Sequence, residues 1–432
     1  MKKVFLSFIV CVALLSFCGV LSADVAFTTD DYSSGTIGII GDDGGGLKIK
    51  AGPFVGYATN LNVLSYADGS RLLLAERPYL GSGGGAEDSL FFFDSSDLSI
   101  PLKNITIPGV SNTYDAEYLD GYLYLICYDG ANIVKIDPDD FTVKARYEFS
   151  DSDIAQGYIP HGVSLASLGE ELFALFIVID NDTLTHANSR LVRLDRDLKA
   201  KDFVLQLPLN AHTAAVSGGS LYVASWGGEQ NSSASSYRSQ LQRVVINGDL
   251  MTAERLFTAA VIDGAQIGAI CFAPDGTALI ATHRYSDDFT TEANLYRLDS
   301  SLAPGARLKL TDSFTLAGWM TSIVYDPDTS CFWVANSNGG ASANQILAFD
   351  DAGKLVKSFS AKDIGGPSSY LAAVKKQEAA GGDDGDSKPD DDGSSQVGGN
   401  TSGMGGSTGC SGGGMFGAAL FIAALVWRRF CI

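Results

Sequence analysis

The predicted folded part of this sequence contains few cysteines. Only Cys127, Cys271 and Cys331 lie between residues 24 and 377, and each is inside an apolar run typical of a strand. Free cysteine in such a run behaves as a small buried hydrophobe. Three cysteines in so long a segment indicate a core that does not depend on disulfide bonds, although the sequence leaves one bridge among them open.

Basic residues are scarce as well. Lysine and arginine total 30 against 50 aspartates and glutamates, which gives a formal net charge of −20 at pH 7. A surface with this excess of negative charge repels the phosphate backbone of nucleic acids. The composition therefore argues against nucleic acid as a partner.

Familiar catalytic motifs are missing between residues 24 and 377. This segment has no Gly-x-Ser-x-Gly elbow, no His-Glu-x-x-His pair and no phosphate-binding loop, each of which places reactive groups at a fixed spacing. No cofactor is evident from the sequence. Its chemistry must be sought in side chains that the fold brings together.

Long stretches with helical periodicity are also lacking between Asp24 and Lys376, and one phrase recurs instead. An apolar run, a tight turn, a second apolar run and a loop precede a third run ending in Asp, another turn and a fourth run. The phrase is clearest over residues 118–146 and returns near Gly218, Gly276 and Phe332. Its period is about fifty residues, in the range of repeat architectures.

Runs rich in Val, Ile, Leu, Phe and Tyr between Asp-Gly or Gly-Gly turns are typical of strands and hairpins. Four strands per repeat at even spacing predict β-propeller blades. We therefore predict an all-β fold, a seven-bladed β-propeller over residues 24–377. Six blades with a separate N-terminal hairpin are the alternative.

The seventh blade is predicted to be split between the two ends of this segment. The runs 26–29, 36–40 and 47–50 read as the last three strands of a blade, and Tyr370–Val374 supplies a first strand. Pairing of these ends would close the ring.

Two blade phrases carry a resemblance to a known family. Residues 335–350 and 128–137 resemble the repeat of YVTN-type and related seven-bladed propellers of surface-layer and periplasmic proteins. The resemblance implies the fold and says little about function.

The N-terminus and the segment after the propeller have their own patterns. Lys2 and Lys3, the apolar run Val4–Val20 and the small residue Ala23 predict an export signal over residues 1–23, cleaved after Ala23. Residues 378–409 are rich in Gly, Ser and Asp without apolar periodicity, which predicts a flexible acidic linker.

Residues 410–432 form a distinct C-terminal tail. Gly409 and Cys410 precede the apolar run Met415–Trp427 and then Arg428 and Arg429. This arrangement resembles the C-terminal sorting tails of the Synergist-CTERM type. The resemblance implies processing at Gly409–Cys410 and attachment of an exported protein to the cell envelope, at the cell surface. A plain single-pass membrane anchor is the alternative.

The predicted loops after the second strands are long, and recognition residues collect on such loops. They cover residues 77–88, 180–188, 227–239 and 284–293. Aligning the blades by their second strands places four residues at one rim position: Arg77, Tyr128, Trp226 and His283. Such a rim suits an extracellular sugar, peptide or planar ligand, although each residue could instead only cap its own blade.

A second candidate site involves two histidines. His161 and His212 precede the inner strands of successive blades, and Asp115 lies in the blade before them. Together they are a partial ligand set for a divalent metal in the central channel. Hydrogen bonding to neighbouring loops is the alternative role.

Three functional hypotheses follow. The first is an envelope-anchored propeller that binds an extracellular small molecule, glycan or protein without catalysis. The second is a secreted metal-dependent hydrolase or lactonase of the propeller kind. The third is a structural surface-layer component. The lack of a catalytic constellation favours the first.

Overall fold

The computed structural model describes the ring of the protein in thirteen stretches. They are residues 24–30, 34–41, 46–54, 58–67, 69–78, 87–180, 182–183, 185–227, 238–262, 266–285, 291–310, 319–337 and 345–374. The predicted signal, linker and tail, with Ala23, Gly409 and Cys410, lie outside these residues. The chain divides into two units, Met1–Ala380 and Gly381–Ile432, and only the first contains described residues.

No described helix has both the length and the apolar character that a bilayer crossing requires.

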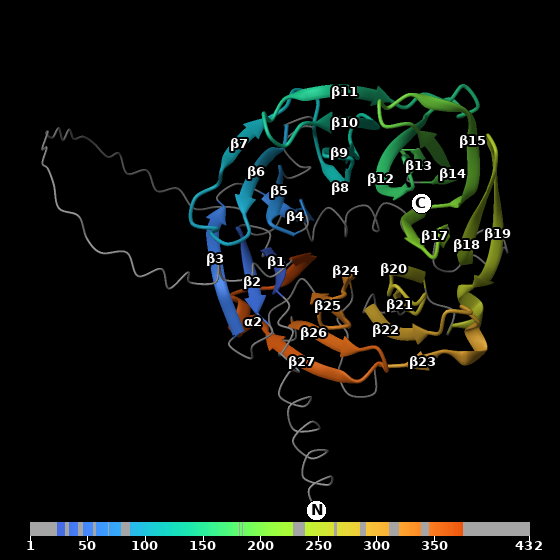
Figure 1. The fold of residues 1–432 in the computed structure, drawn as a ribbon. Helices are drawn as coiled ribbons and strands as arrows, with labels where there is room; N and C mark the ends of the chain where they lie inside the picture. The colour runs from blue at the N-terminus through green and yellow to red at the C-terminus, as the bar shows by residue number, and fades with distance from the viewer. Residues whose placement is uncertain are drawn as a thin grey trace, which may run out of the picture. The chain divides into compact units, whose positions relative to one another are not determined.

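Seven antiparallel sheets of four strands surround a common centre (Figure 1). Blade 1 contains β28 (Ser368–Val374), β1 (Asp24–Asp30), β2 (Gly35–Gly41) and β3 (Gly46–Phe54). Blade 2 contains β4 (Ala58–Tyr66), β5 (Arg71–Pro78), β6 (Ser89–Asp94) and β7 (Lys103–Thr106). Blade 3 contains β8 (Thr113–Leu119), β9 (Tyr122–Cys127), β10 (Asn132–Ile136) and β11 (Val143–Glu148).

The remaining blades repeat this order. Blade 4 contains β12 (Tyr158–Leu168), β13 (Glu171–Asp180), β14 (His186–Leu194) and β15 (Ala200–Leu209). Blade 5 contains β16 (Ala211–Ser217), β17 (Ser220–Gly227), β18 (Arg238–Asn247) and β19 (Leu250–Thr258). Blade 6 contains β20 (Gln266–Phe272), β21 (Ala278–Tyr285), β22 (Thr291–Leu298) and β23 (Leu308–Lys309). Blade 7 contains β24 (Trp319–Asp326), β25 (Cys331–Ser337), β26 (Gln345–Asp350) and β27 (Leu355–Ser360).

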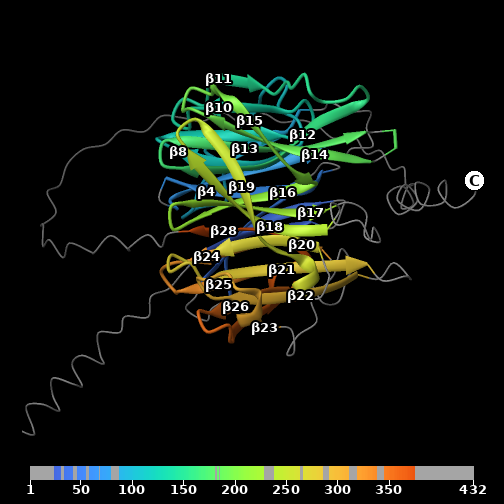
Figure 2. The same cartoon turned by 90° about the vertical axis from the view of Figure 1, so that its right-hand side faces the viewer.

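The protein is therefore a seven-bladed β-propeller, as its repeat predicts, and the six-bladed alternative is wrong. Its described helices are short: η3 (Ala259–Val261), η4 (Pro304–Ala306) and α2 (Ala361–Ile364). In the view turned by 90°, the strands cross the thickness of the ring in nearly parallel directions (Figure 2). This arrangement collects the connections on two opposite faces.

The two ends of the described chain close the ring in blade 1. Strand β28 is the inner strand, and it pairs antiparallel with β1 from Asp24↔Val374 to Thr29↔Ser368. The prediction that the N-terminal strands complete a blade begun by Tyr370–Val374 is confirmed.

Tight two-residue hairpins join the first and second strands of blades 3 and 5. Asp120 and Gly121 connect β8 to β9 with φ of 53° and 82°, and Gly218 and Gly219 connect β16 to β17 with φ of 55° and 73°. Positive φ at both central residues is the type I′ geometry that matches the twist of paired strands. The Asp-Gly and Gly-Gly pairs thus fix the register of these hairpins.

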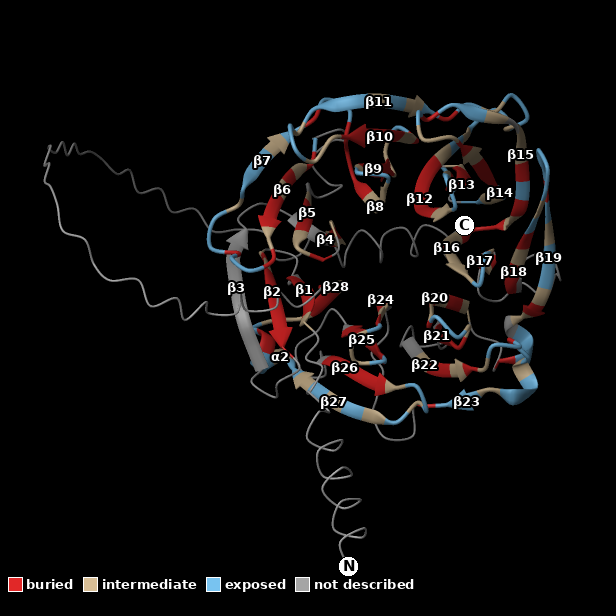
Figure 3. Ribbon diagram, in the orientation of Figure 1, coloured by how far each residue is buried: buried red, intermediate tan, exposed pale blue. Residues whose placement is uncertain are grey.

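Seven hydrophobic clusters fill the spaces between neighbouring blades. Figure 3 shows buried second and third strands and exposed fourth strands such as β11 and β27. The cluster between blades 7 and 1 contains Trp333 and Phe27, both at most 1% exposed, together with Leu371 of β28. Ring closure therefore completes an apolar core as well as a strand ladder.

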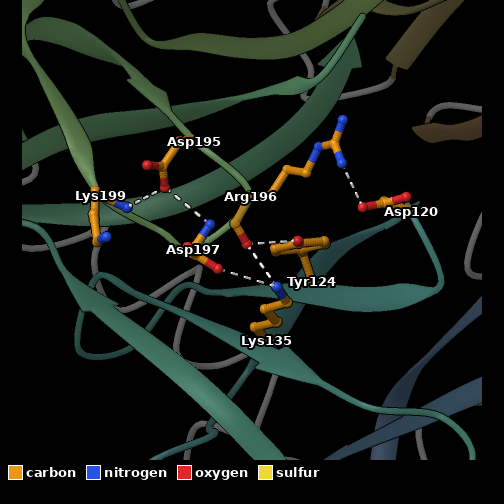
Figure 4. A network of polar contacts seen from close by, with 7 residues as sticks. All are labelled: Asp120, Tyr124, Lys135, Asp195, Arg196, Asp197 and Lys199. Carbon is orange, nitrogen blue, oxygen red and sulfur yellow. Dashed lines mark hydrogen bonds and ion pairs between the residues drawn. The ribbon is translucent and has the colours of Figure 1, made fainter.

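Polar contacts also join adjacent blades. Figure 4 shows those between blades 3 and 4, near the hairpin that joins β8 to β9. Tyr124 Oη and Lys135 Nζ both donate to the carbonyl oxygen of Arg196, each at 2.8 Å. The Arg196 guanidinium in turn contacts Asp120 Oδ2 at 2.7 Å. Hydrogen bonding of a buried amine lowers the cost of removing it from water.

The three cysteines of the propeller are free: Cys127, Cys271 and Cys331. Burial raises the pKa of the Cys127 and Cys271 thiols to about 12. Because the thiolate is the reactive form, these side chains pack as small hydrophobes.

Candidate functional site

Three of the four predicted rim residues, Tyr128, Trp226 and His283, have equivalent register positions in the structure. Arg77, Tyr128 and Trp226 are each the sixth residue after the first paired residue of their second strand, and His283 is the fifth. Tyr128, Trp226 and His283 share a second feature. Each directly follows the second-strand residue whose partner on the inner strand comes just before the register shift. In blade 2 that shift lies farther from the hairpin, and the side chain of Arg77 is outside the described residues.

Six aromatic rings from blades 3 to 6 form one continuous series on this face, which we call the ring array. Its members, in spatial order, are His161, Tyr128, Tyr114, His212, Trp226 and His283. Successive ring centroids are 4.2, 5.3, 5.5, 4.3 and 5.2 Å apart. These separations lie within the range of favourable aromatic contacts. The array thus joins three of the rim residues, Tyr128, Trp226 and His283, to the two histidines that were predicted as metal ligands.

Two members reach the array because they occupy β-bulges. The inner strand of blade 3 has one extra residue between the pairs Thr113↔Cys127 and Asp115↔Ile126, and that residue is Tyr114. His212 occupies the same position in blade 5. A bulge redirects a side chain from the regular alternation of a strand. Sequence reasoning missed Tyr114, although its place directly before Asp115 was visible.

Blades 3 and 5 hold their rim residues with the same backbone contact. The Tyr128 N–H donates to the Asn112 carbonyl and the Trp226 N–H to the Asn210 carbonyl, both at 2.9 Å. Asn112 and Asn210 have φ of 55° and 54°, and asparagine tolerates this left-handed conformation better than most residues. The rim residues of blades 3 and 5 are therefore held in place by the same backbone geometry.

In blade 6, a glycine leaves room for the side chain of His283. Gly268 is the bulge residue of β20, and a Cβ added there would lie 2.8 Å from His283 Nδ1. Such a contact is too short for real atoms, so the ring of His283 requires glycine opposite it.

The ends of the ring array are buried and its middle is partly open. His161 and His283 are 6% and 2% exposed, whereas Tyr114, Tyr128, His212 and Trp226 are half-buried. His161 Nδ1 is 3.0 Å from the Tyr128 carbonyl oxygen, which accepts from the tautomer protonated at Nδ1. A ligand on this face would meet the four middle rings.

Burial keeps three rings of the array neutral. It lowers the pKa of His212 to about 4, with a smaller contribution from the nearby His283, and lowers that of His283 to about 4. Burial also raises the pKa of Tyr128 to about 12. At neutral pH these three rings therefore carry no charge, because desolvation disfavours their ionised forms.

Asp115 has a different environment from the ring array. Its Oδ2 accepts from Ser164 Oγ at 3.0 Å and from the Leu165 N–H at 2.9 Å, and its Oδ1 accepts from the Ala116 N–H at 2.8 Å. Ser164 Oγ in turn accepts from the Ala214 N–H at 3.1 Å. Asp115 therefore joins the inner strands of blades 3 and 4, and the contact continues to blade 5.

These contacts bear on the predicted metal site. His161 lies against Tyr128, and His212 is stacked on Trp226 with 8° between the ring planes. Within the described part of the chain, no three His, Cys, Asp or Glu side chains are grouped so that they could hold a metal ion. A divalent metal on His161, His212 and Asp115 stays a prediction from sequence.

Comparisons with known proteins support the fold. No family model matches the chain, and no curated protein matches it. The periplasmic gluconolactonase PpgL of Pseudomonas aeruginosa is 16% identical with a TM-score of 0.53, covering 82% of this chain and 99% of its own. At such identity the likeness extends to the propeller fold alone.

Two further solved structures share the fold at lower identity. AztD from Citrobacter koseri is 12% identical over 82% of this chain and 98% of its own, with a TM-score of 0.47. The β-propeller domain of Cps50 (Swd1) from Myceliophteria thermophila is 12% identical over 73% of this chain and 93% of its own, with a TM-score of 0.48.

The stacking of His212 on Trp226 predicts an unusual acid titration. A protonated imidazole quenches the fluorescence of an indole that it contacts, so emission from Trp226 should fall with a midpoint near pH 4, the pKa of His212. An exposed histidine would give a midpoint near pH 6.5. The measurement is the difference in emission between the parent protein and Trp226→Phe from pH 3.5 to 8, with circular dichroism to locate acid unfolding.

The same pKa shift affects stability with a defined sign. The folded-state pKa of His212 lies below its unfolded value, so its contribution to stability is complete above about pH 6.5 and is lost as the pH falls towards 4. Replacement by Gln should remove that loss. A quenching midpoint near 6.5 that His212→Gln abolishes would show that the histidine is solvated and would contradict the burial described above.

Proposed function

We propose that this protein is an exported, envelope-attached β-propeller that binds an extracellular ligand through the ring array. The observation that carries the proposal is the continuity of six rings from four blades on the face where the inner strands begin. Half-buried rings of this kind offer apolar faces at a low cost in side-chain entropy.

The neutral state of three of these rings narrows the class of ligand that the array can bind. His212, His283 and Tyr128 carry no charge at neutral pH, so the array offers π faces without a strong electrostatic preference. Stacking on such faces suits the apolar side of a neutral sugar or a planar ring. A protein partner that presents an aromatic side chain would use the same surface.

Location outside the cytoplasm is part of the proposal. It is supported by the predicted signal over residues 1–23 and the tail that resembles sorting segments. The likeness in fold to a protein described as periplasmic agrees with it. Detection of the mature chain in an envelope fraction, with its N-terminus at Asp24, would test this part.

The binding role is tested by changing Trp226. We expect Trp226→Ala to weaken binding of neutral oligosaccharides or planar probes such as indole derivatives by about tenfold or more, since the loss of one stacked ring amounts to at least about 1.4 kcal/mol. Trp226→Phe keeps a ring and should retain most of the affinity. Isothermal titration calorimetry on ligands first found with a neutral glycan array provides the measurement.

The control is thermal unfolding of each variant, because half-buried Trp226 also packs against His212 and His283. Binding that survives Trp226→Ala and His212→Ala unchanged, in proteins with unaltered melting, would place the ligand elsewhere. The hydrolase alternative is tested separately by metal analysis of the purified protein, in which a stoichiometric ion lost on His161→Ala would favour it.

A further inference from the structure

A groove lies between the outer parts of blades 4 and 5, away from the central axis. It has a volume of about 460 Å³, within the range of small-molecule sites. Strands β15 and β19 run next to each other here (Figure 1). Its lining includes Leu205, Pro208, Gln242, Ala253 and Arg255.

Gln242 differs in residue type from the residues at the corresponding position of four other blades. It is paired with Val223 in the second strand. The corresponding residues of blades 3, 4, 6 and 7 are Val134, Val192, Tyr296 and Leu347. All four are at most 1% exposed and belong to the clusters between blades. The repeat therefore calls for an apolar or aromatic side chain where blade 5 has a carboxamide.

The carboxamide of Gln242 is buried without full compensation. The residue is 8% exposed, and its Oε1 has no hydrogen-bond partner among the residues that the structure describes. A buried acceptor left in this state costs about 1–3 kcal/mol. A chain that keeps such a group where four other blades have apolar or aromatic ones has a use for an acceptor facing the groove.

Arg255 adds a charge directly beside this acceptor. It is opposite Gln242 in the ladder between β18 and β19, and its side chain is exposed. No ion pair to Arg255 occurs within the described stretches, even though the chain has 50 acidic residues. Leu205, Pro208 and Ala253 supply apolar surface around the two polar groups.

We propose that this groove binds a small organic carboxylate that has an N–H or O–H donor close to its acid group. The carboxylate contacts the guanidinium of Arg255, since arginine recognises carboxylates through paired N–H groups. The donor satisfies Gln242 Oε1, and the aliphatic part of the ligand covers Leu205, Pro208 and Ala253. Amino acids or short peptides and hydroxy acids or uronates are two sources of this chemistry.

The site is separate from the ring array in residues and in chemistry. The array offers aromatic faces, whereas the groove has no aromatic side chain in its lining. Trp226→Ala should therefore leave carboxylate binding unchanged, and failure of one proposal does not imply failure of the other.

The experiment is a saturation-transfer NMR screen of the full chain against two sets of compounds, followed by calorimetry. One set contains α-amino acids and dipeptides, and the other contains hydroxy acids and hexuronates. We expect millimolar or tighter binding from one set, and loss of binding when the carboxylate is a methyl ester. Arg255→Ala and Gln242→Leu should each weaken binding at least tenfold.

Matched controls separate binding from folding. Arg243 is the next residue of β18 and contacts Glu254 on the other side of the strand, so Arg243→Ala should bind as the parent does. Gln242→Leu restores the residue type of the other blades and should raise the melting temperature by a few degrees while it loses binding.

Two results would overturn the proposal. One is the absence of any carboxylate ligand in both sets, in which case Gln242 contacts only water. The other is a carboxylate whose affinity is unaffected by both Arg255→Ala and Gln242→Leu. A preference for one set identifies which donor, N–H or O–H, the groove selects.

Discussion

Removal of β28 should abolish cooperative folding of the propeller. A chain that ends at Pro367 loses the strand that pairs with β1 and the side chains of Leu371, Ala372 and Val374, which are 4%, 6% and 3% exposed. A buried leucine or valine side chain contributes about 1.5–3 kcal/mol, and alanine contributes less. Together with an entire strand ladder, this approaches the whole stability of a domain, about 5–15 kcal/mol.

The matched control is a chain that ends at Ala380, the boundary of the first unit. It keeps β28 and should unfold at the parent temperature in calorimetry. Leu371→Asp is a milder test, since it places a charge against Phe27 across the ladder and should lower the melting temperature by many degrees. A chain ending at Pro367 that unfolds in one sharp transition at the parent temperature would show that β28 is not needed for closure.

Asp115 should give the protein a stability that falls as the pH rises. Burial is the largest cause that raises the pKa of Asp115, to about 6, and the hydrogen bonds from Leu165, Ala116 and Ser164 oppose it. A folded-state pKa above the unfolded value contributes stability that is complete below about pH 4 and is lost as the pH rises through about 6. Between pH 4.5 and pH 8 the loss amounts to about 2 kcal/mol.

Asp115→Asn keeps an acceptor for the Leu165 N–H and removes the titration. The free energy of unfolding, measured with urea at pH 4.5 and pH 8, should therefore show about 2 kcal/mol less loss in the variant than in the parent. Ser322→Ala is the matched control, because Ser322 Oγ accepts from the Leu371 N–H at 3.1 Å without an ionisable group. It should destabilise equally at both pH values. Equal pH dependence in the parent and in Asp115→Asn would mean that this carboxylate is solvated.

The fold could be predicted because the same order of apolar runs and turns recurs along the sequence. Gly218 and Gly219 specify a hairpin on their own, and six whole phrases with a seventh split between the ends leave few arrangements other than a ring. The split blade could also be predicted. Three strands at the N-terminal end lack a first strand, and a single strand at the C-terminal end supplies it. The boundaries of individual strands depend on pairing with neighbours, which no single run of residues determines.

The candidate site was predictable only in part. Tyr128, Trp226 and His283 share a register position that alignment of the repeats can identify. Tyr114 and His212 reach them through bulges, and a bulge depends on the pairing of two strands rather than on either sequence. The role of Asp115 depends on Ser164 and Leu165 of the next blade. The repeat did contain a signal for Gln242, a polar residue at a position that is apolar or aromatic in four other blades.

The placement of β28 beside β1 sets an order of events during synthesis. Asp24 cannot find its partner until Val374 has been made, so the barrier to folding includes closing a loop that spans nearly the whole ring. Until that moment β1 has one unpaired edge, and blade 1 can add a strand from another copy. A chain that crosses a membrane from its N-terminus would lack its last strand until the end of the crossing. This order favours passage in an unfolded state. Chaperones on the far side would then protect the unpaired edge of β1.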